Sequence, residues 1–394
     1  MKYEFEAMRI GDCCNIIKKS IRPERGHIYT CFSLPAFDNS NTPEILNGED
    51  IKSSKLVLDE NTILFNKLNP KFRRVWNIHS LEKYENTICS TEFLPLKAKD
   101  NIEQDYLYYY ISSPYFTRLM DGIRTGTSNS QQRIDWKRFL QEPINVPALS
   151  IQRKVVSLLS NIDKKIELNK AINNNLAEQS QAIFAEFMCK YPYVLSPLGD
   201  MAEIIDCLHS KKPEAVNDTA YQLLQLNNIT DSGFLDLSSK YYISKSDYEN
   251  WTRKCEIVEG DCVITNVGRI GAVSQAPNGT HAAMGRNMTC IRLRKDKPFY
   301  SYLITALLSP HIRREIMKNT DEGTIMGALN VKNIPLLLFP MFAPPTMNAL
   351  EDLLSPIRKA IEQNYLSNQT LSLLRDSLLP RLMSGELDVS DIDL

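Results

Sequence analysis

The sequence lacks the patterns that mark metal-stabilised, secreted or membrane proteins. Its nine cysteines are odd in number and include no Cys-x-x-Cys pair, which favours reduced thiols in a reducing compartment. Cys207 and His209 are close in sequence but have no second pair of ligand residues, so we expect no metal site. The N-terminus has no apolar signal segment, and the longest apolar run, residues 335–345, is proline-rich and too short to cross a bilayer. We therefore expect a cytoplasmic protein without a membrane segment.

The common motifs of nucleotide-dependent and DNA-modifying enzymes are also missing. The chain contains no Gly-x-x-x-x-Gly-Lys-Ser/Thr phosphate loop, so we expect no ATP motor in it. The segment Asn69-Pro70-Lys71-Phe72 lacks the second proline of the adenine methyltransferase motif, and no glycine-rich cofactor motif precedes it. None of the five histidines has an obvious Ser, Cys or Asp partner. These absences favour an adaptor with no catalytic residues and no bound cofactor.

Length and charge set further limits. A chain of 394 residues exceeds one ordinary core, so at least two domains are expected. Its 43% hydrophobic and 24% charged residues are typical of a soluble globular protein. The net charge of −1 excludes binding to nucleic acid by overall charge. If DNA is the ligand, positive charge must be concentrated locally and partners must contribute some of it.

The strongest pattern is a seven-residue apolar ladder that occurs twice. Residues 150–188 contain no proline or glycine and predict one unbroken helix. The ladder has one polar rung, Asn169, and it recurs near the C-terminus at a constant offset of 195 positions, with Asn364 on the same rung. The apolar rungs are Val155, Ile162, Leu176 and Ile183 in the first copy and Leu350, Ile357, Leu371 and Leu378 in the second.

An apolar seam with one asparagine in each helix is typical of a coiled coil whose register is fixed. Because both copies lie in one chain, we predict that the two helices pair with each other, with Asn169 and Asn364 setting the register. A helix of about 38 residues would be roughly 55 Å long. The alternative is two unrelated amphipathic helices on separate cores, which the gap-free match of the two copies disfavours.

The parts between the helices repeat in layout. A helical patch around Ser113-Pro114, a glycine-containing loop and a final strand precede the first long helix, and a second patch around Ser309-Pro310 begins the same order again. The long helices of the two halves match closely in sequence, whereas the globular parts match only in the order of their elements. A duplication would thus have kept the helices as a common scaffold while the surfaces of the globular parts diverged. We predict an α/β (α+β) protein with a pseudo-twofold internal duplication. Its expected segments are a first globular domain at 1–148, a central helix at 149–190, a second domain at 191–345 and a C-terminal helix and tail at 346–394.

These features resemble the DNA-specificity subunits of type I restriction–modification systems. The resemblance covers the layout of nearly the whole chain and is most specific at the helices and their junctions. The Pro-Pro-x-x-Glu-Gln entry to each helix in that family is only partly retained, as Pro147 with Gln152 and as Pro344-Pro345 with Asn348. Besides the ladders, the segments on which the resemblance rests are Lys67–Pro70, Gly260–Thr265, Gly268–Gly271, Gly323-Thr324 and Leu378–Leu387.

The resemblance implies two target-recognition domains separated by two long helices that pair as an antiparallel intramolecular coiled coil. It implies a non-catalytic subunit that reads an asymmetric, two-part target in double-stranded DNA. Two modification (methyltransferase) subunits and the restriction (translocase) subunits would be its partners, and S-adenosylmethionine, ATP and Mg²⁺ would be bound by them. We expect docking on charged helix faces, although such charges are usually only solvated: Lys164, Lys165, Glu167, Lys170, Glu178 and Gln181.

Two other functions stay open at this point. One is a single-chain DNA-modifying enzyme with an unrecognised site, and the other is a coiled-coil scaffold that binds only proteins. Turnover by the chain alone would favour the first, and absence of DNA binding at low salt would favour the second.

Four stretches are candidates for DNA contact, because cations can anchor phosphates while amides and guanidinium groups read base edges. For each, the alternative is an ordinary solvated turn or surface loop. In the first domain the candidates are Asn66, Lys67, Asn69, Lys71, Arg73 and Arg74, followed by Arg124, Ser128, Asn129, Gln131, Gln132 and Arg133. In the second they are Thr265, Asn266 and Arg269 on a glycine-flanked turn, followed by Arg286 and Asn287.

Overall fold

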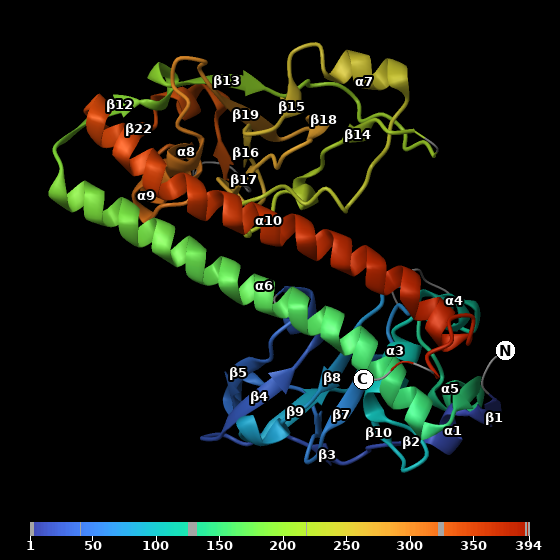
Figure 1. The fold of residues 1–394 in the computed structure, drawn as a ribbon. Helices are drawn as coiled ribbons and strands as arrows, with labels where there is room; N and C mark the ends of the chain where they lie inside the picture. Colours follow the sequence, from blue (N-terminus) through green and yellow to red (C-terminus); the bar gives the residue numbers. More distant parts are fainter. Residues whose placement is uncertain are drawn as a thin grey trace. The chain divides into compact units, whose positions relative to one another are not determined.

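The computed structural model describes residues 4–39, 41–124, 132–217, 219–321, 327–390 and 392. The chain forms two compact units, and each is built from two stretches of sequence. Unit 1 contains residues 1–165 and 370–394, and unit 2 contains residues 166–369. The division falls inside the two longest helices, α6 (Leu149–Lys190) and α10 (Pro344–Met383), so each unit holds a globular part and a portion of both helices (Figure 1).

Unit 1 has a four-stranded sheet of order β2-β10-β7-β8, a five-stranded sheet of order β3-β6-β9-β4-β5, and the antiparallel pair β1·β11. Its strands are β1 (Phe5–Arg9), β2 (Cys14–Ile16), β3 (Ser20–Ile21), β4 (Ile28–Phe32), β5 (Glu44–Asn47), β6 (Lys55–Val57), β7 (Thr62–Asn66), β8 (Val75–Ile78), β9 (Thr87–Ser90), β10 (Phe93–Ala98) and β11 (Pro143–Pro147). Its shorter helices are α1 (Ile10–Cys13), α2 (Leu34–Asn39), α3 (Gln104–Ile111), α4 (Pro114–Gly122) and α5 (Trp136–Gln141).

Unit 2 has a four-stranded sheet of order β13-β19-β16-β17, a three-stranded sheet of order β14-β18-β15, and the pairs β12·β22 and β20·β21. Its strands are β12 (Tyr193–Pro197), β13 (Ala202–Asp206), β14 (Gln222–Leu223), β15 (Glu256–Val258), β16 (Cys262–Thr265), β17 (Val273–Gln275), β18 (His281–Ala283), β19 (Met288–Leu293), β20 (Thr320–Asp321), β21 (Ala328–Leu329) and β22 (Leu338–Phe342). Its shorter helices are α7 (Lys245–Trp251), α8 (Tyr300–Leu307) and α9 (Pro310–Lys318).

The globular parts repeat one topology, which is more than the layout match that the sequence indicates. In both units the four-stranded sheet has the same strand order once the strands are matched in chain order, with all three pairings antiparallel. The second sheet repeats one parallel and one antiparallel pairing, β4·β9 with β6·β9 in unit 1 and β14·β18 with β15·β18 in unit 2. The predicted internal duplication is confirmed.

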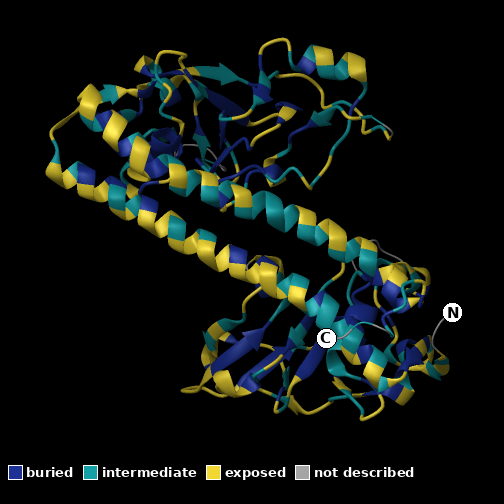
Figure 2. Ribbon diagram, in the orientation of Figure 1, coloured by how far each residue is buried: buried dark blue, intermediate teal, exposed yellow. Residues whose placement is uncertain are grey.

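Each unit packs both long helices into its own core. In unit 1, Val155 and Leu159 of α6 and Leu382 of α10 join the core around Tyr106 and Phe116. In unit 2 the core around Tyr302 contains Phe184 and Phe187 of α6 and Leu350 and Leu354 of α10. The sheet strands are largely buried, whereas the long helices alternate buried and exposed residues (Figure 2). Tertiary burial of an amphipathic face therefore stabilises these helices beyond their own propensity.

The helices pair antiparallel through two asparagine pairs within unit 2. Asn169 Nδ2 donates to Asn368 Oδ1 at 2.8 Å, and Asn364 Nδ2 donates to Asn173 Oδ1 at 2.9 Å. Going along α6 from Asn169 to Asn173, the partner residue on α10 changes from Asn368 back to Asn364, so the two helices run antiparallel. The predicted pattern of one asparagine per helix was incomplete, because each helix contributes two and neither Asn169 nor Asn364 pairs with the other.

Candidate nucleic-acid interface

Two of the predicted DNA-contacting stretches come together in unit 1. The turn that follows β7 runs antiparallel to the segment beginning at Gln132: Asn69 N donates to Gln132 O at 2.8 Å, and Ile134 N donates to Lys67 O at 3.0 Å. Lys67 N in turn donates to Glu92 O at 3.0 Å. We call residues 66–74, 92 and 132–134 junction 1. Stretches that are some sixty positions apart in the sequence thus form one surface element.

Asn66 stabilises this turn from inside. Its side chain is buried, its Nδ2 donates to Leu68 O at 2.6 Å, and its Oδ1 accepts from Leu68 N at 2.9 Å. Asn69 takes a positive φ of 51°, a conformation that asparagine tolerates better than most residues. Asn66 is therefore engaged by its own backbone in this conformation, although it was predicted as a base reader.

The cations of junction 1 differ in how far they are engaged. Arg74 forms a bidentate pair with Asp38 at 2.6 and 2.8 Å, a geometry that fixes a guanidinium firmly. Arg133 pairs with Glu92 at 2.7 Å while it stays 55% exposed. Lys71 and Arg73 are exposed, and Arg73 donates only to Ser112 O, at 3.0 Å.

An aromatic ring lies among these cations. Phe72 is 50% exposed, and Lys71 Nζ and the Arg74 guanidinium each lie 5.0 Å from its ring centroid. Such an exposed ring beside cations suits stacking or apolar contact with a base or sugar. Phe72 was not among the residues predicted to contact DNA.

The second predicted loop of unit 1 is described only at its ends. Arg124 is exposed and forms an ion pair with Asp121, and Gln132 is half-buried beside the turn. Ser128, Asn129 and Gln131 lie outside the described residues.

Unit 2 repeats the hydrogen-bond pattern of junction 1. Asn266 N donates to Asn287 O at 2.9 Å, and Leu329 N donates to Asn266 O at 2.9 Å. Asn266, Asn287 and Leu329 therefore take the places that Lys67, Glu92 and Ile134 take in unit 1. We call residues 265–271, 286–287 and 328–329 junction 2. The predicted stretches at Thr265 and Arg286 are thereby brought together.

Thr265 and Asn266 are buried and hold junction 2 rather than face solvent. Thr265 Oγ1 donates to Arg269 O and accepts from Ala272 N at 3.1 Å. Asn266 Nδ2 donates to Leu329 O at 3.1 Å, and its Oδ1 accepts from Thr289 Oγ1 at 3.0 Å. Both side chains are satisfied by neighbouring groups, as Asn66 is in unit 1.

The exposed polar residues of junction 2 are Arg269, Arg286 and Asn287. Arg269 donates to Ile229 O at 3.1 Å and pairs with Asp231, so it has competing partners. Arg286 makes no side-chain hydrogen bond or ion pair with any described residue. Asn287 has a φ of +63° at the tip of the turn that carries both residues. Arg286 is thus the most available cation of this junction.

Position 271, at the end of the 265–271 turn of junction 2, requires a glycine. Gly271 has a φ of +71°, and a Cβ there would lie 2.6 Å from Ile316 Cγ2 and 2.9 Å from Arg313 Nη1. Gly271 is therefore held in place by its backbone conformation and by its packing against α9, neither of which the sequence indicates.

Comparison with known proteins identifies the chain. Residues 2–178 match the family described as the type I restriction modification DNA specificity domain. The type I restriction enzyme HindI specificity subunit from Haemophilus influenzae is 25% identical over 420 residues, covering 87% of this chain and 90% of that protein. Residues 2–178 therefore carry a type I restriction–modification DNA-specificity domain, and most of the chain is similar to a specificity subunit. As predicted from the sequence, the chain is a sequence-specific recognition subunit rather than a catalytic one.

A solved structure supports the fold of this specificity subunit. The S subunit of a type I restriction–modification system from M. genitalium superposes with a TM-score of 0.53 at 14% identity, covering 97% of this chain and 96% of that one. The predicted fold class, α/β domains with long helices, is confirmed at this level. Among the helices of the described residues, none combines the length and the apolar character that a bilayer span requires.

In unit 2 of the specificity subunit, Arg358 of α10 fixes the loop 233–235, a contact that the sequence analysis missed. Its Nη2 donates to Gly233 O at 2.6 Å, its Nε donates to Gln275 Oε1 at 2.8 Å, and its guanidinium lies 3.4 Å from the Phe234 ring centroid. Tyr365 stacks on the same ring and donates to Leu235 O at 2.8 Å. Burial lowers the pKa of Arg358 to about 9.

In unit 1 the long helices α6 and α10 are held by other polar residues than the Arg358 and Tyr365 of unit 2. Asp163 of α6 accepts from Tyr109 Oη at 2.7 Å and from Arg375 Nη1 of α10 at 2.9 Å. Burial, together with the neighbouring Asp163 carboxylate, raises the pKa of Tyr109, so the phenol stays a donor. The two units thus share a topology but fasten the long helices with unrelated residues.

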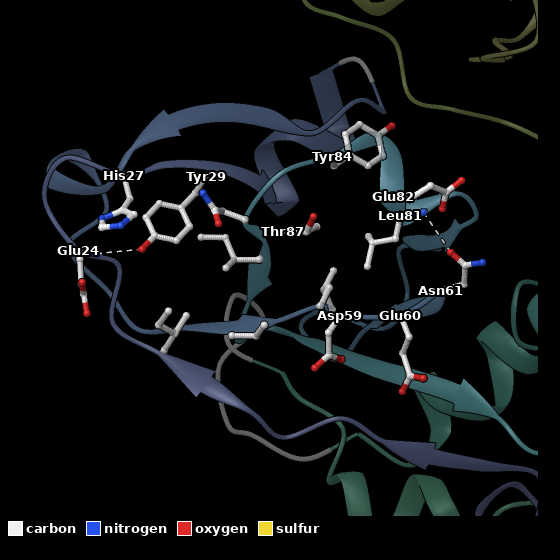
Figure 3. A pocket seen from close by; sticks show the side chains of 15 residues that line it. Glu24, His27, Tyr29, Asp59, Glu60, Asn61, Leu81, Glu82, Tyr84 and Thr87 are labelled. Carbon is white, nitrogen blue, oxygen red and sulfur yellow. Dashed lines mark hydrogen bonds between the residues drawn. The ribbon is translucent and has the colours of Figure 1, made fainter.

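A pocket of about 740 Å³ in unit 1 lies apart from junction 1. Figure 3 shows its lining, which includes Glu24, Asp59, Glu60 and Glu82 and none of the residues of junction 1. Lys19 and Lys97 pair with Asp59 and Glu60, yet they leave the lining acidic. Acidic side chains repel phosphates, so this hollow is not where we look for DNA.

Proposed function

We propose that the specificity subunit reads an asymmetric, two-part target in double-stranded DNA, one part with junction 1 and the other with junction 2. The observation that carries this proposal is the repeated hydrogen-bond pattern: one backbone arrangement occurs in both units with different residues at matching positions. Lys67 corresponds to Asn266, and Glu92 corresponds to Asn287. Because base readout depends on side chains, the two parts of the target should differ in sequence.

Exposure divides the predicted DNA-contacting residues into two roles. Buried Asn66, Thr265 and Asn266 hold the turns. The residues that we propose to contact DNA directly are Lys67, Asn69, Lys71, Phe72, Arg73 and Arg133 in unit 1 and Arg269, Arg286 and Asn287 in unit 2. Arg74 supports junction 1 through Asp38, and Arg124 with Ser128, Asn129, Gln131 and Gln132 remains a candidate loop.

The paired helices would set the distance between the two parts of the target. Both α6, with 42 residues, and α10, with 40, are continuous from one unit into the other. A helix of this length extends about 60 Å at 1.5 Å per residue, which exceeds one turn of B-DNA at about 34–36 Å. Bases between the two parts would then go unread.

Catalysis would come from modification and restriction subunits, with S-adenosylmethionine, ATP and Mg²⁺ bound by them. For docking we favour the exposed face of α6 that carries Lys164, Lys165, Glu167 and Lys170. Leu168 is 54% exposed on the same stretch and offers apolar area. Gln181 is a weaker candidate than its sequence suggested, because its Nε2 donates to Thr305 O at 2.9 Å within unit 2.

Binding experiments with single-residue variants test the proposal. The complex of this chain with its methyltransferase partner would be titrated with its DNA target at several salt concentrations. We expect Lys71→Ala or Arg286→Ala to weaken binding and to reduce the slope of log affinity against log salt by about 1. Lys83→Ala in unit 1 and Lys245→Ala in unit 2 are matched controls, since both cations are exposed and lie outside the junctions.

Base contacts require a second readout. Asn287→Ala should relax the preference at one part of the target by about 1–3 kcal/mol and leave the other part unchanged. Equal losses at both parts, or losses as large in the Lys83 and Lys245 controls, would remove the assignment of one junction to each part.

A further inference from the structure

Three potential metal ligands meet at the end of β13 in unit 2. A carboxylate oxygen of Asp206, the sulfur of Cys207 and a ring nitrogen of His209 all lie within 4.8 Å of one another. His209 Nε2 and Asp206 Oδ2 are 2.8 Å apart. Oxygen, sulfur and imidazole nitrogen together are the ligand types that zinc accepts.

Two of these ligands are held as a metal site would require. Asp206 Oδ1 is buried and has no hydrogen-bond partner among the described residues, which is costly for a carboxylate oxygen. Cys207 is 2% exposed, and the backbone N–H groups of Asn287 and Met288 point at its sulfur. Burial raises the pKa of this thiol most, the two backbone N–H groups lower it, and the adjacent Asp206 carboxylate raises it.

The spacing of the cluster is close to that of a tetrahedral zinc site. Zinc bonds of about 2.0–2.3 Å place ligand atoms roughly 3.4–3.8 Å apart, so a small closure of the cluster suffices. His209 is 68% exposed on its side chain and can turn once its contact with Asp206 is exchanged for the metal.

We propose that Asp206, Cys207 and His209 bind one zinc ion, with water as the fourth ligand. The ion would hold the end of β13, and the Cys207 sulfur, which the N–H groups of Asn287 and Met288 contact, would link it to the turn that presents Arg286. From the sequence, no metal site was expected at Cys207 and His209 because a second pair of ligands is missing. The third ligand is instead the adjacent carboxylate, and the two amide donors come from a turn some eighty positions away.

The other cluster of this kind in the described residues does not suit a metal. Cys255, Asp261 and Cys290 lie together, but Arg292 occupies both carboxylate oxygens of Asp261, at 2.8 and 2.5 Å. A bound cation there would have to displace the half-buried Arg292 guanidinium from the buried Asp261 carboxylate. The Asp206 cluster has no such competitor.

Metal binding by the full-length chain is the test. The protein would be stripped with a chelator, dialysed against Zn²⁺, and analysed by mass spectrometry of the metal. A parallel sample loaded with Co²⁺ would be examined for the charge-transfer absorption of a cobalt–thiolate bond. We expect about one ion per chain and a thiolate band, as a Cys-containing site of this type gives.

Variants locate the ion. Cys207→Ser should abolish the thiolate band, and His209→Ala should weaken zinc binding by about tenfold or more. His209 is exposed, so its loss of binding cannot be attributed to unfolding. Cys189→Ser and His281→Ala are the controls, because one removes an exposed cysteine and the other an exposed histidine paired with a carboxylate.

The proposal is overturned if the stripped chain takes up no stoichiometric zinc, if the cobalt form lacks a thiolate band, or if His209→Ala binds as tightly as the parent. Binding that is lost equally in the Cys189 or His281 variant would also overturn it, because the ion would then lie elsewhere.

Discussion

Arg358 illustrates how a single side chain fastens a helix to a domain. Its guanidinium satisfies the carbonyl of Gly233 and the amide of Gln275 and covers the Phe234 ring. Truncation would leave these polar groups without their donor and the ring without its cation. Arg358→Ala should therefore destabilise unit 2 by about 2–4 kcal/mol.

Urea unfolding followed by Trp251 fluorescence measures this, since that residue is buried in unit 2. Lys359→Ala removes the neighbouring exposed cation of α10 and should change stability by less than about 0.5 kcal/mol. Equal effects of the two variants would contradict the role given to Arg358.

His79 and Asp105 give unit 1 a pH-dependent contact. The hydrogen bond that His79 donates to the Asp105 carboxylate raises the pKa of His79 above its ordinary 6.5, and burial opposes this less strongly. Burial tends to raise the pKa of Asp105, but hydrogen bonds from His79 and Asn77 outweigh it and lower that pKa. The ion pair therefore contributes stability below about pH 6.5 and loses it as pH rises through the folded-state pKa of His79.

His79→Gln should accordingly cost more stability at about pH 5.5 than at about pH 8.5, by less than about 1 kcal/mol because the pair is partly exposed. Chemical denaturation of both proteins at the two pH values provides the comparison. A larger loss at the higher pH would reverse the sign and exclude the ion pair.

At the residue scale, the sequence located the right stretches but not the role of each side chain. The basic run from Lys67 to Arg74 does form an exposed turn. Asn66, Thr265 and Asn266 were selected for their amides and hydroxyls, yet their own turns use those groups. Residue type shows that a group can donate or accept, whereas only the local backbone shows whether it is already engaged.

The asparagines of the long helices allow a prediction at the scale of the element. Asn169→Leu removes a buried Oδ1 that has no partner among the described residues but also deprives Asn368 Oδ1 of a donor, so the two effects partly offset and stability should change by about 1 kcal/mol or less. Asn173 accepts from Asn364 and donates to Ile361 O at 3.1 Å. Asn173→Leu deprives both groups of a partner and should cost about 1–3 kcal/mol.

Thermal and urea unfolding of the two variants under identical conditions decide between them. The substitutions introduce the same side chain one helical turn apart, so each serves as the control of the other. A greater loss in Asn169→Leu would show that the asparagine pairs do not act as their hydrogen bonds indicate.

The long helices could be predicted because their periodicity extends over many turns, and in α10 it continues through Pro356 and Pro380. Junctions 1 and 2 could not, because they depend on strand pairing between segments far apart in the sequence, such as Lys67 with Ile134. Short strands carry little periodic signal, and their partners are set by the tertiary fold.

At the scale of the whole molecule, duplication links the two reading units. The four predicted segments, 1–148, 149–190, 191–345 and 346–394, remain a prediction about domains, whereas the compact units divide inside α6 and α10. Each unit therefore includes parts of both helices, which a linear list of segments cannot express.

Helix length should determine the gap in the target. Inserting seven residues into both α6 and α10, beside Ala171 and Leu366, keeps the heptad phase and adds about 10 Å, or about three base pairs. We expect a target with unchanged parts and a longer gap, detected by selecting bound sequences from a randomised pool. Three-residue insertions are the control, because they rotate the helix faces out of phase. An unchanged gap with full binding would contradict the spacer role.

The most direct test is a map of methylated adenines across the genome in cells with this gene, without it, and with its Asn287→Ala variant. The account predicts an interrupted, asymmetric motif that disappears with the gene and becomes degenerate in one part only in the variant. A motif that survives deletion of the gene, that reads the same on both sides of the gap, or that degrades in both parts together would contradict two dissimilar reading units in one chain.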